Sequence, residues 1–347
     1  MKTMLRILVV SFLLAVNLLA QSIEPHKNIT GFYLGQEPPG LMPKLFAPGI
    51  VCTGFNERDV AISPKGDEIY FGLLTGKQIT VMYTKLVNGN WSEPEAASFA
   101  KDDNYFFLEA CLSPDGNKIS FLSTRPPKGK QPKPRWTYQN IWTCDRNPDG
   151  SWGEAYMDTT INQNNAQFYP SYTKDGTIYF TYDNPQTKKP EIYRSRMHEG
   201  KYLKPEKLPP VINREGTSVY NAFISRDEDY LIACVDGIEN QINPGVANYY
   251  VFFRDAKDNW SEPVSFGPEI NIKGSTAMSA SVSPDGKYLF FAAQKFSKEN
   301  EQLVKNKTLG NLIKLSNSGQ NGNYDIYWVD KAVIDSLKTK AVFQSSK

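Results

Sequence analysis

The stretch SPDGNKISF at 113–121 and its counterpart SPDGKYLFF at 283–291 decide the fold, because they are copies of one structural unit. In each copy Pro and Asp-Gly preset the backbone angles of a tight turn, and a β-prone run follows. Weaker copies bring the number of such turns to five, at intervals of 50, 60, 52 and 58 residues. They are Ser63-Pro64-Lys65-Gly66, Ser113-Pro114-Asp115-Gly116, Thr173-Lys174-Asp175-Gly176, Ser225-Arg226-Asp227-Glu228 and Ser283-Pro284-Asp285-Gly286. Self-similarity at such a period indicates a repeat architecture.

A second marker, an aromatic residue after a polar turn, follows in four of the five units. It occurs at Asn90-Trp91, Ser151-Trp152, Lys201-Tyr202 and Asn259-Trp260. A further strand fits between the two markers, so each unit is predicted to hold four antiparallel strands, called a to d from the inside outward. Radially repeated four-stranded units of this length are the blades of a β-propeller. The sequence therefore predicts an all-β fold, a five-bladed β-propeller.

The two ends of the chain predict how the propeller closes. The fifth unit has no aromatic marker for its strand d, but 41–50 (LMPKLFAPGI) is similar to the strand d stretch at 262–270 (EPVSFGPEI). We expect this N-terminal strand to complete the last blade, which would leave no free sheet edge. Six blades are the alternative, if the insertion at 295–323 contains a degenerate unit.

The first twenty residues have the pattern of a secretory signal. Lys2 and Arg6 precede an apolar run at 7–19, and Ala20 ends it. The run is shorter than the roughly 20 apolar residues of a bilayer span, so we expect a cleaved signal rather than a membrane-spanning anchor. The protein is then periplasmic or extracellular, with one propeller domain over 21–347. Its blades are predicted at about 59–100, 109–162, 169–213, 219–271, and 279–335 plus 41–50.

Composition narrows the classes of partner. The chain has 39 Lys plus Arg and 37 Asp plus Glu, a balance that argues against a nucleic-acid binder. Only two His are present, and the four Cys form no C-x-x-C pair, so we expect no metal and no cofactor. The disulfide state of the cysteines stays open; they are Cys52, Cys111, Cys144 and Cys234. We expect a monomer.

The repeat also resembles a known family. A Ser-Pro-Asp-Gly turn followed by Lys-x-(aromatic or aliphatic)-x-Phe, as at 113–121 and 283–291, is similar to the TolB-like, WD-repeat-related propeller repeats of exported bacterial proteins. The resemblance covers nearly the whole chain after the signal. It implies the propeller fold and leaves function open, because such repeats occur in binding proteins, scaffolds and enzymes.

Strand a, which lines the central channel, carries the candidate site residues. The residue four positions before each turn is polar in every unit, and the residue after it is apolar. Because strand residues alternate between faces, we expect a ring of polar side chains near the axis. The ring residues are Asp59, Glu109, Tyr169, Asn221 and Ser279. Glu57, Arg58, Gln167 and Tyr220 are their neighbours and complete the candidate set at the channel.

Two functions compete. The first is a binding or scaffold propeller that takes a protein or carbohydrate ligand on the face of the b–c loops, at the channel mouth. The second is a carbohydrate-active enzyme. Glycosidases of the five-bladed arabinanase type use carboxylates from successive inner strands, and Asp59 and Glu109 resemble part of that set, with Glu57 as a further carboxylate. Tyr169 departs from the pattern, and an ion pair between these acids and Arg58 would weaken the enzyme hypothesis.

Long loops on the same face are the other candidates, because irregular loops on a rigid scaffold usually carry binding residues. They span 124–138, 236–247 and 295–323. The first is rich in Lys and Arg and contains Arg135 and Trp136, which are candidates for gripping an acidic glycan. The third is either mobile or forms a short helix over the pocket, through Leu303, Leu309, Leu312 and Ile313.

Overall fold

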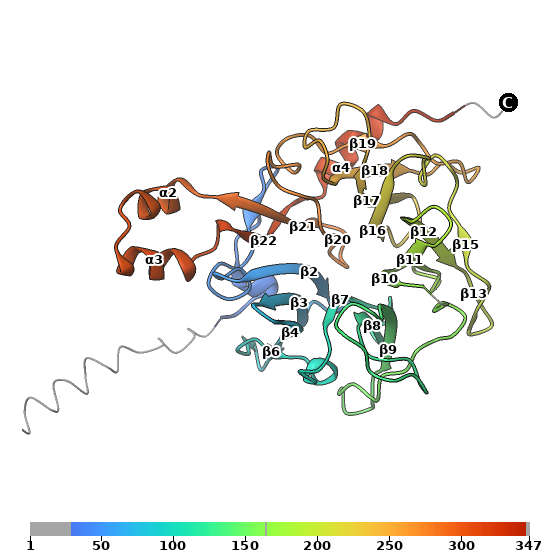
Figure 1. Cartoon of the computed structure of the whole chain (residues 1–347), viewed down its shortest axis with the longest axis horizontal. Helices are drawn as coiled ribbons and strands as arrows, with labels where there is room; N and C mark the ends of the chain where they lie inside the picture. The colour runs from blue at the N-terminus through green and yellow to red at the C-terminus, as the bar shows by residue number, and fades with distance from the viewer. Residues whose placement is uncertain (1–28, 164, 345–347) are drawn as a thin grey trace, which may run out of the picture.

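The computed structural model describes residues 29–163 and 165–344, so the predicted signal at 1–20 lies outside the described residues. Five antiparallel sheets stand around a central axis, and together they form a five-bladed β-propeller (Figure 1). The fold class predicted from the repeat is therefore confirmed. Within 29–163 and 165–344, no helix is both long and apolar enough to span a bilayer.

Each blade begins at the axis with its strand a. Blade 1 comprises β2 (Asn56–Ile62), β3 (Glu68–Thr75), β4 (Gln78–Val87), β5 (Asn90–Trp91) and β6 (Glu95–Ala96). Blade 2 comprises β7 (Phe107–Leu112), β8 (Lys118–Ser123) and β9 (Asn140–Asp145), with an outer bridge between Thr143 and Tyr156. Blade 3 comprises β10 (Gln167–Tyr172), β11 (Ile178–Asn184), β12 (Lys189–Ser195) and β15 (Glu206–Lys207), with a small hairpin of β13 (Met197–His198) and β14 (Lys201–Tyr202). Blade 4 comprises β16 (Ser218–Ile224), β17 (Tyr230–Asp236), β18 (Asn248–Phe253) and β19 (Val264–Ser265). Blade 5 comprises β20 (Ala280–Val282), β21 (Tyr288–Phe296), β22 (Asn321–Asp330) and β1 (Lys44–Leu45).

The repeated turn forms for a local reason. In blade 2 the Ser113 hydroxyl accepts the backbone N–H of Lys118 at 2.9 Å and donates to Asp115. Gly116 has a φ of +73°, a conformation that side chains disfavour, and its N–H donates to the Ser113 carbonyl at 2.9 Å. Strands a and b are thereby held in one register by the turn itself.

The closure is the one predicted. In β1, Lys44 pairs with Trp328 and Leu45 with Tyr327 of β22, so the N-terminal strand is the outermost strand of blade 5. Phe46 follows it, is 0% exposed, and packs edge-on against Phe290 and Trp328. Large aromatic side chains of this kind contribute several kcal/mol when fully buried.

The hydrophobic core is divided among the spaces between neighbouring blades. Tyr70 and Val81 of blade 1 face Phe107 and Phe121 of blade 2, for example. The four cysteines are free thiols; Cys52, Cys144 and Cys234 are buried and Cys111 is half-buried. Short helices complete the chain: η1 (Phe32–Gly35), η2 (Ser98–Ala100), α4 (Ala332–Leu337) and η3 (Lys338–Lys340).

The insertion of blade 5 is a helical hairpin, not a sixth blade. It consists of α2 (Lys298–Lys305) and α3 (Leu309–Ser316), which extend away from the axis instead of covering it (Figure 1). Ser297 and Thr308 cap the two N-termini through their hydroxyls. The expected helix is thus present, but it does not lie over the channel.

Candidate functional site

Four of the five ring residues occupy β-bulges in strand a. Asp59, Glu109, Tyr169 and Asn221 have φ values of 59°, 59°, 53° and 50°, and the register of each strand a shifts next to them. A left-handed conformation costs a non-glycine residue on the order of 1 kcal/mol, so other contacts must hold it. Ser279 in blade 5 immediately precedes β20.

Hydrogen bonds between blades hold the bulges. The backbone N–H of Asp59 donates to the Ser279 hydroxyl at 3.1 Å, that of Glu109 to Asp59 Oδ2 at 3.3 Å, and that of Tyr169 to Glu109 Oε2 at 2.9 Å. The Tyr169 hydroxyl reaches blade 5, where it lies 3.0 Å from the Ala280 nitrogen and 2.9 Å from its oxygen. The ring residues therefore link blades 5, 1, 2 and 3 into a closed circuit.

Blade 4 joins this circuit through Asn221. Its backbone N–H donates to the Thr181 hydroxyl of blade 3 at 2.9 Å, and its side-chain amide donates to the Met278 carbonyl of blade 5. All five residues of the predicted ring thus make contacts between blades.

Arg58 lies beside the two ring acids. Its Nε is 2.7 Å from Asp59 Oδ1 and its Nη2 is 2.9 Å from Glu109 Oε1, and the three side chains are between 1% and 9% exposed. Burial raises the pKa of Glu109, although Arg58 opposes the rise. Burial opposes the charged form of Arg58, but Asp59 and Glu109 raise its pKa above the ordinary range. All four carboxyl oxygens have partners, two from Arg58 and two from backbone N–H groups.

This pairing bears on the enzyme hypothesis. A glycosidase needs one protonated and one ionised carboxyl, both accessible to the sugar. Here Asp59 and Glu109 are buried, and their oxygens are committed to Arg58 and to the bulges. This ion pair with Arg58 is the arrangement that was expected to weaken a catalytic role. The hydrogen bonds and the ion pair instead connect neighbouring blades.

The other sequence candidates lie elsewhere. Glu57 is 0% exposed and accepts hydrogen bonds from Thr53, away from the ion pair. Gln167 is also 0% exposed and accepts a hydrogen bond from Asn140 at 3.3 Å. Tyr220 is partly buried, which raises its pKa above the ordinary range. None of these three is bonded to the ring acids.

Arg135 and Trp136 are on the 124–138 loop, away from the ring. The Arg135 guanidinium lies 4.7 Å from the centre of the Phe106 ring. The centre of the Trp136 ring lies 4.9 Å from the centre of the same Phe106 ring. Trp136 remains 44% exposed. The two residues therefore pack against Phe106, which immediately precedes the inner strand β7.

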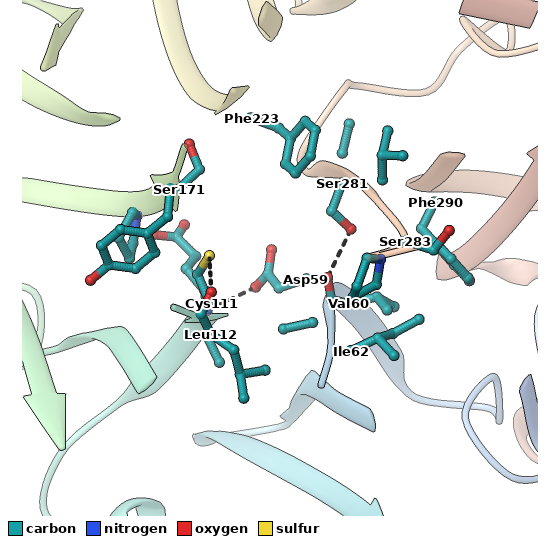
Figure 2. Close-up of a pocket in the computed structure, with 18 of the residues that line it drawn as sticks. Asp59, Val60, Ile62, Cys111, Leu112, Ser171, Phe223, Ser281, Ser283 and Phe290 are labelled. Atoms are coloured by element: carbon teal, nitrogen blue, oxygen red, sulfur yellow. Dashed lines mark hydrogen bonds between the residues drawn. The ribbon is translucent and has the colours of Figure 1, made fainter. Parts of the chain in front are cut away.

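A pocket occupies the channel on the side of the repeated turns (Figure 2). It contains about 730 Å³ of empty space, part of it open to solvent, and Asp59, Glu109 and Tyr169 lie at its inner end. Its mouth is lined by Pro114, Pro284 and other residues of the turns. This pocket opens on the face opposite to the one that the sequence favoured.

A larger groove lies on the b–c face, between blades 2 and 3. It contains about 2030 Å³ of empty space, part of it open to solvent, and is lined by both b–c loops and by the connection between the blades. Lys130, Lys133 and Lys188 line it, and within 29–163 and 165–344 none of them forms an ion pair. Asp183 is the one carboxylate of the lining, and burial raises its pKa. The described residues contain no cluster of three or more His, Cys, Asp or Glu suited to a metal.

A third repeated signal was available in the sequence and was missed. Ile-Asn pairs lead from one blade to the next at 161–162, 212–213 and 270–271, and a further pair at 242–243 lies within a b–c loop. In each of the three pairs between blades, the Asn side chain bonds both the N–H and the carbonyl of one residue in strand c of its own blade. The bonded pairs are Asn162 with Ile141, Asn213 with Ile192, and Asn271 with Tyr249. These asparagines fix the connection between blades, so Asn162 in the groove is a structural residue.

No protein-family model and no curated protein sequence matches this chain. Solved structures with a similar fold include TolB from Acinetobacter baumannii, with a TM-score of 0.44 and 15% identity over 80% of this chain and 57% of that one. The endo-arabinase from Bacteroides thetaiotaomicron VPI-5482 has a TM-score of 0.45 and 15% identity, over 72% of this chain and 92% of that one. The likeness concerns the fold alone, and the chain spans 57% of the length of the Acinetobacter TolB.

Proposed function

We propose that this protein is an exported binding propeller that takes an acidic carbohydrate in the groove between blades 2 and 3. The observation that carries the proposal is a set of three lysines around one open groove that form no ion pair with any residue the structure describes, Lys130, Lys133 and Lys188. They come from two separate loops, so a ligand that contacts all three must lie across both blades. Three cations against a single carboxylate, Asp183, favour an anionic ligand.

The electrostatic contribution of each lysine is modest. Exposed ion pairs contribute about 0.2–1 kcal/mol each and are screened by salt. Three of them together correspond to roughly a tenfold gain in affinity, and the ligand must therefore also make neutral contacts. The lining offers these through Thr137, Gln139 and Thr159.

Aromatic side chains favour a carbohydrate among anionic ligands. The Lys133 ammonium lies 6.0 Å from the centre of the Tyr138 ring, and the Tyr138 hydroxyl donates to the Gln131 carbonyl at 3.0 Å. Because Lys133 lies over the Tyr138 ring, a uronate or sulfated sugar would bring its anionic group to the ammonium and pack its ring against the part of Tyr138 that the ammonium leaves open. The open, mostly polar shape of the groove suits a chain of sugars better than a compact apolar molecule.

The test is calorimetric titration with an oligogalacturonate hexamer and a neutral hexasaccharide. We expect the acidic sugar to bind more tightly. The triple variant Lys130→Ala, Lys133→Ala, Lys188→Ala should lose about tenfold in affinity.

A matched control removes the same charge from α2–α3 through Lys305→Ala, Lys307→Ala and Lys314→Ala, and it should bind like the wild type. An equal loss in both triple variants, or equal binding of the two sugars by the wild type, would overturn the proposal.

A further inference from the structure

The channel pocket on the turn face is separate from the groove and has a different character. Its walls are apolar side chains from the inner strands, and Ile62, Leu112 and Phe223 surround it (Figure 2). The residues that follow the ring positions complete the inner end: Val60, Ala110, Pro170 and Ala280. A concave, mostly apolar pocket with a few polar groups is the usual form of a small-molecule site.

The polar groups in the wall are already bonded. The Ser171 hydroxyl donates to the Ala222 carbonyl at 2.9 Å, and the Ser281 hydroxyl donates to the Val60 carbonyl at 2.8 Å. Burial raises the pKa of the Cys111 thiol to about 12, so this thiol is neutral. The ring acids Asp59 and Glu109 are both bonded to Arg58, and burial raises the pKa of Glu109. The wall therefore suits the apolar body of a ligand.

The mouth of the pocket carries one cation, Arg226. It stands in the turn of blade 4 at the position that is Pro64, Pro114 and Pro284 in three other blades. The side chain at the same position of blade 3, Lys174, pairs with Asp227 at 2.6 Å. Arg226 is therefore a departure from the repeat that places a guanidinium at the pocket.

Among the described residues, the Arg226 guanidinium has no hydrogen-bond or ion-pair partner. Within 29–163 and 165–344 the other arginines each donate at least one side-chain hydrogen bond, whereas only the backbone carbonyl of Arg226 is bonded, by the Lys174 N–H. Its charge acts on the pocket, because it opposes the rise in the Cys111 pKa. A half-buried, unpaired arginine beside apolar walls is suited to a carboxylate, which guanidinium groups bind through two parallel hydrogen bonds.

We propose that the channel pocket binds a small monocarboxylate with an apolar body, with the carboxylate at Arg226 and the body between the inner strands. The site opens on the face of the turns, so it is independent of the carbohydrate groove on the other face.

Octanoate is the probe, and protection of Cys111 is the readout. Cys111 lines the pocket and is half-buried, whereas the other three cysteines are buried, so a small methanethiosulfonate should modify it first. Because the raised pKa leaves little thiolate, the reaction is slow and is followed at alkaline pH with a long time course. We expect octanoate to slow this modification in a saturable way, with mass spectrometry locating the label. 1-Octanol, with an equally long chain and no charge, should protect at roughly tenfold higher concentration, since a charged hydrogen bond is lost.

Two variants complete the test. Arg226→Gln should weaken protection by octanoate about tenfold and leave protection by 1-octanol unchanged. Lys65→Gln removes a charge from the equivalent turn of blade 1, outside the channel pocket, and should have no effect. No protection by octanoate at millimolar concentration, or full protection in Arg226→Gln, would overturn the proposal. Direct titration of octanoate into the two folded variants gives an independent measure of the same affinities.

Discussion

Two buried carboxyl groups between blades 5 and 1, Glu57 and Asp325, should make the stability of the protein fall as the pH rises. They are 0% and 1% exposed. One oxygen of each, Glu57 Oε2 and Asp325 Oδ1, has no hydrogen-bond partner. Burial raises the pKa of Glu57 from 4.5 to about 7 and that of Asp325 from 3.8 to about 7. No cation among the residues that the structure describes is paired with either group to hold it ionised.

The unfolding free energy falls with rising pH because the folded protein holds these protons more tightly than the unfolded chain does. The stabilisation is fully present below the unfolded pKa and is lost as the pH rises through about 7. For Glu57 the interval between 4.5 and about 7 corresponds to about 3 kcal/mol of unfolding free energy. Glu57→Gln carries no charge at any pH. The variant should therefore gain about 3 kcal/mol relative to the wild type between roughly pH 4 and pH 8.

The assay is urea unfolding followed by tryptophan fluorescence, at fixed ionic strength and at a series of pH values. The quantity compared is the difference in unfolding free energy between variant and wild type at each pH. Glu239→Gln, which removes an exposed carboxylate, is the control and should show almost no pH-dependent difference. If the difference for Glu57→Gln were constant from pH 4 to pH 8, the reasoning from burial would be wrong.

Three further changes test the ring, the closure and the helical insertion. Glu109→Gln takes one of two buried counter-charges from Arg58 and should lower the unfolding free energy by about 2 kcal/mol in urea; an unchanged midpoint would contradict a structural role. Phe46→Ala should cost about 3–5 kcal/mol by the same assay, because the side chain is 0% exposed, and a loss under 1 kcal/mol would argue against closure at this strand. In Gly54→Ala the added Cβ would lie 1.6 Å from the Ser316 carbonyl oxygen, so hydrogen exchange in α3 should accelerate; unchanged exchange would refute this packing.

The local features of the fold could be predicted from the sequence. The Ser-Pro-Asp-Gly turn specifies its own hydrogen bonds, as Ser113 and Gly116 show, so the repeat and the number of blades followed from it. The closure by 41–50 was predictable because the fifth unit lacks one of its four strands. The insertion at 295–323 was predictable as helix from its leucines, but its direction was not, because it depends on the approach of Gly54 to α3.

The contacts of the ring could not be predicted in the same way. Alternation along a strand places Arg58 and Asp59 on opposite faces, yet the left-handed conformation at Asp59 brings their side chains within 2.7 Å. The partners of the bulges are in neighbouring blades, 40 or more residues away, as with Asp59 and Glu109. The groove likewise depends on two loops from different blades lying side by side, which no single stretch of sequence indicates.

The position of a bound acidic sugar tests the central claim most directly. An oligogalacturonate hexamer with a photoreactive group at its reducing end can be crosslinked to the protein, and the labelled peptides identified by mass spectrometry. We predict labels within 127–140 and 183–188, and competition by unmodified acidic sugar but not by a neutral hexasaccharide. Labels confined to the turn face or to α2–α3 would contradict the account, and so would labelling that a neutral hexasaccharide prevents as well as the acidic sugar does.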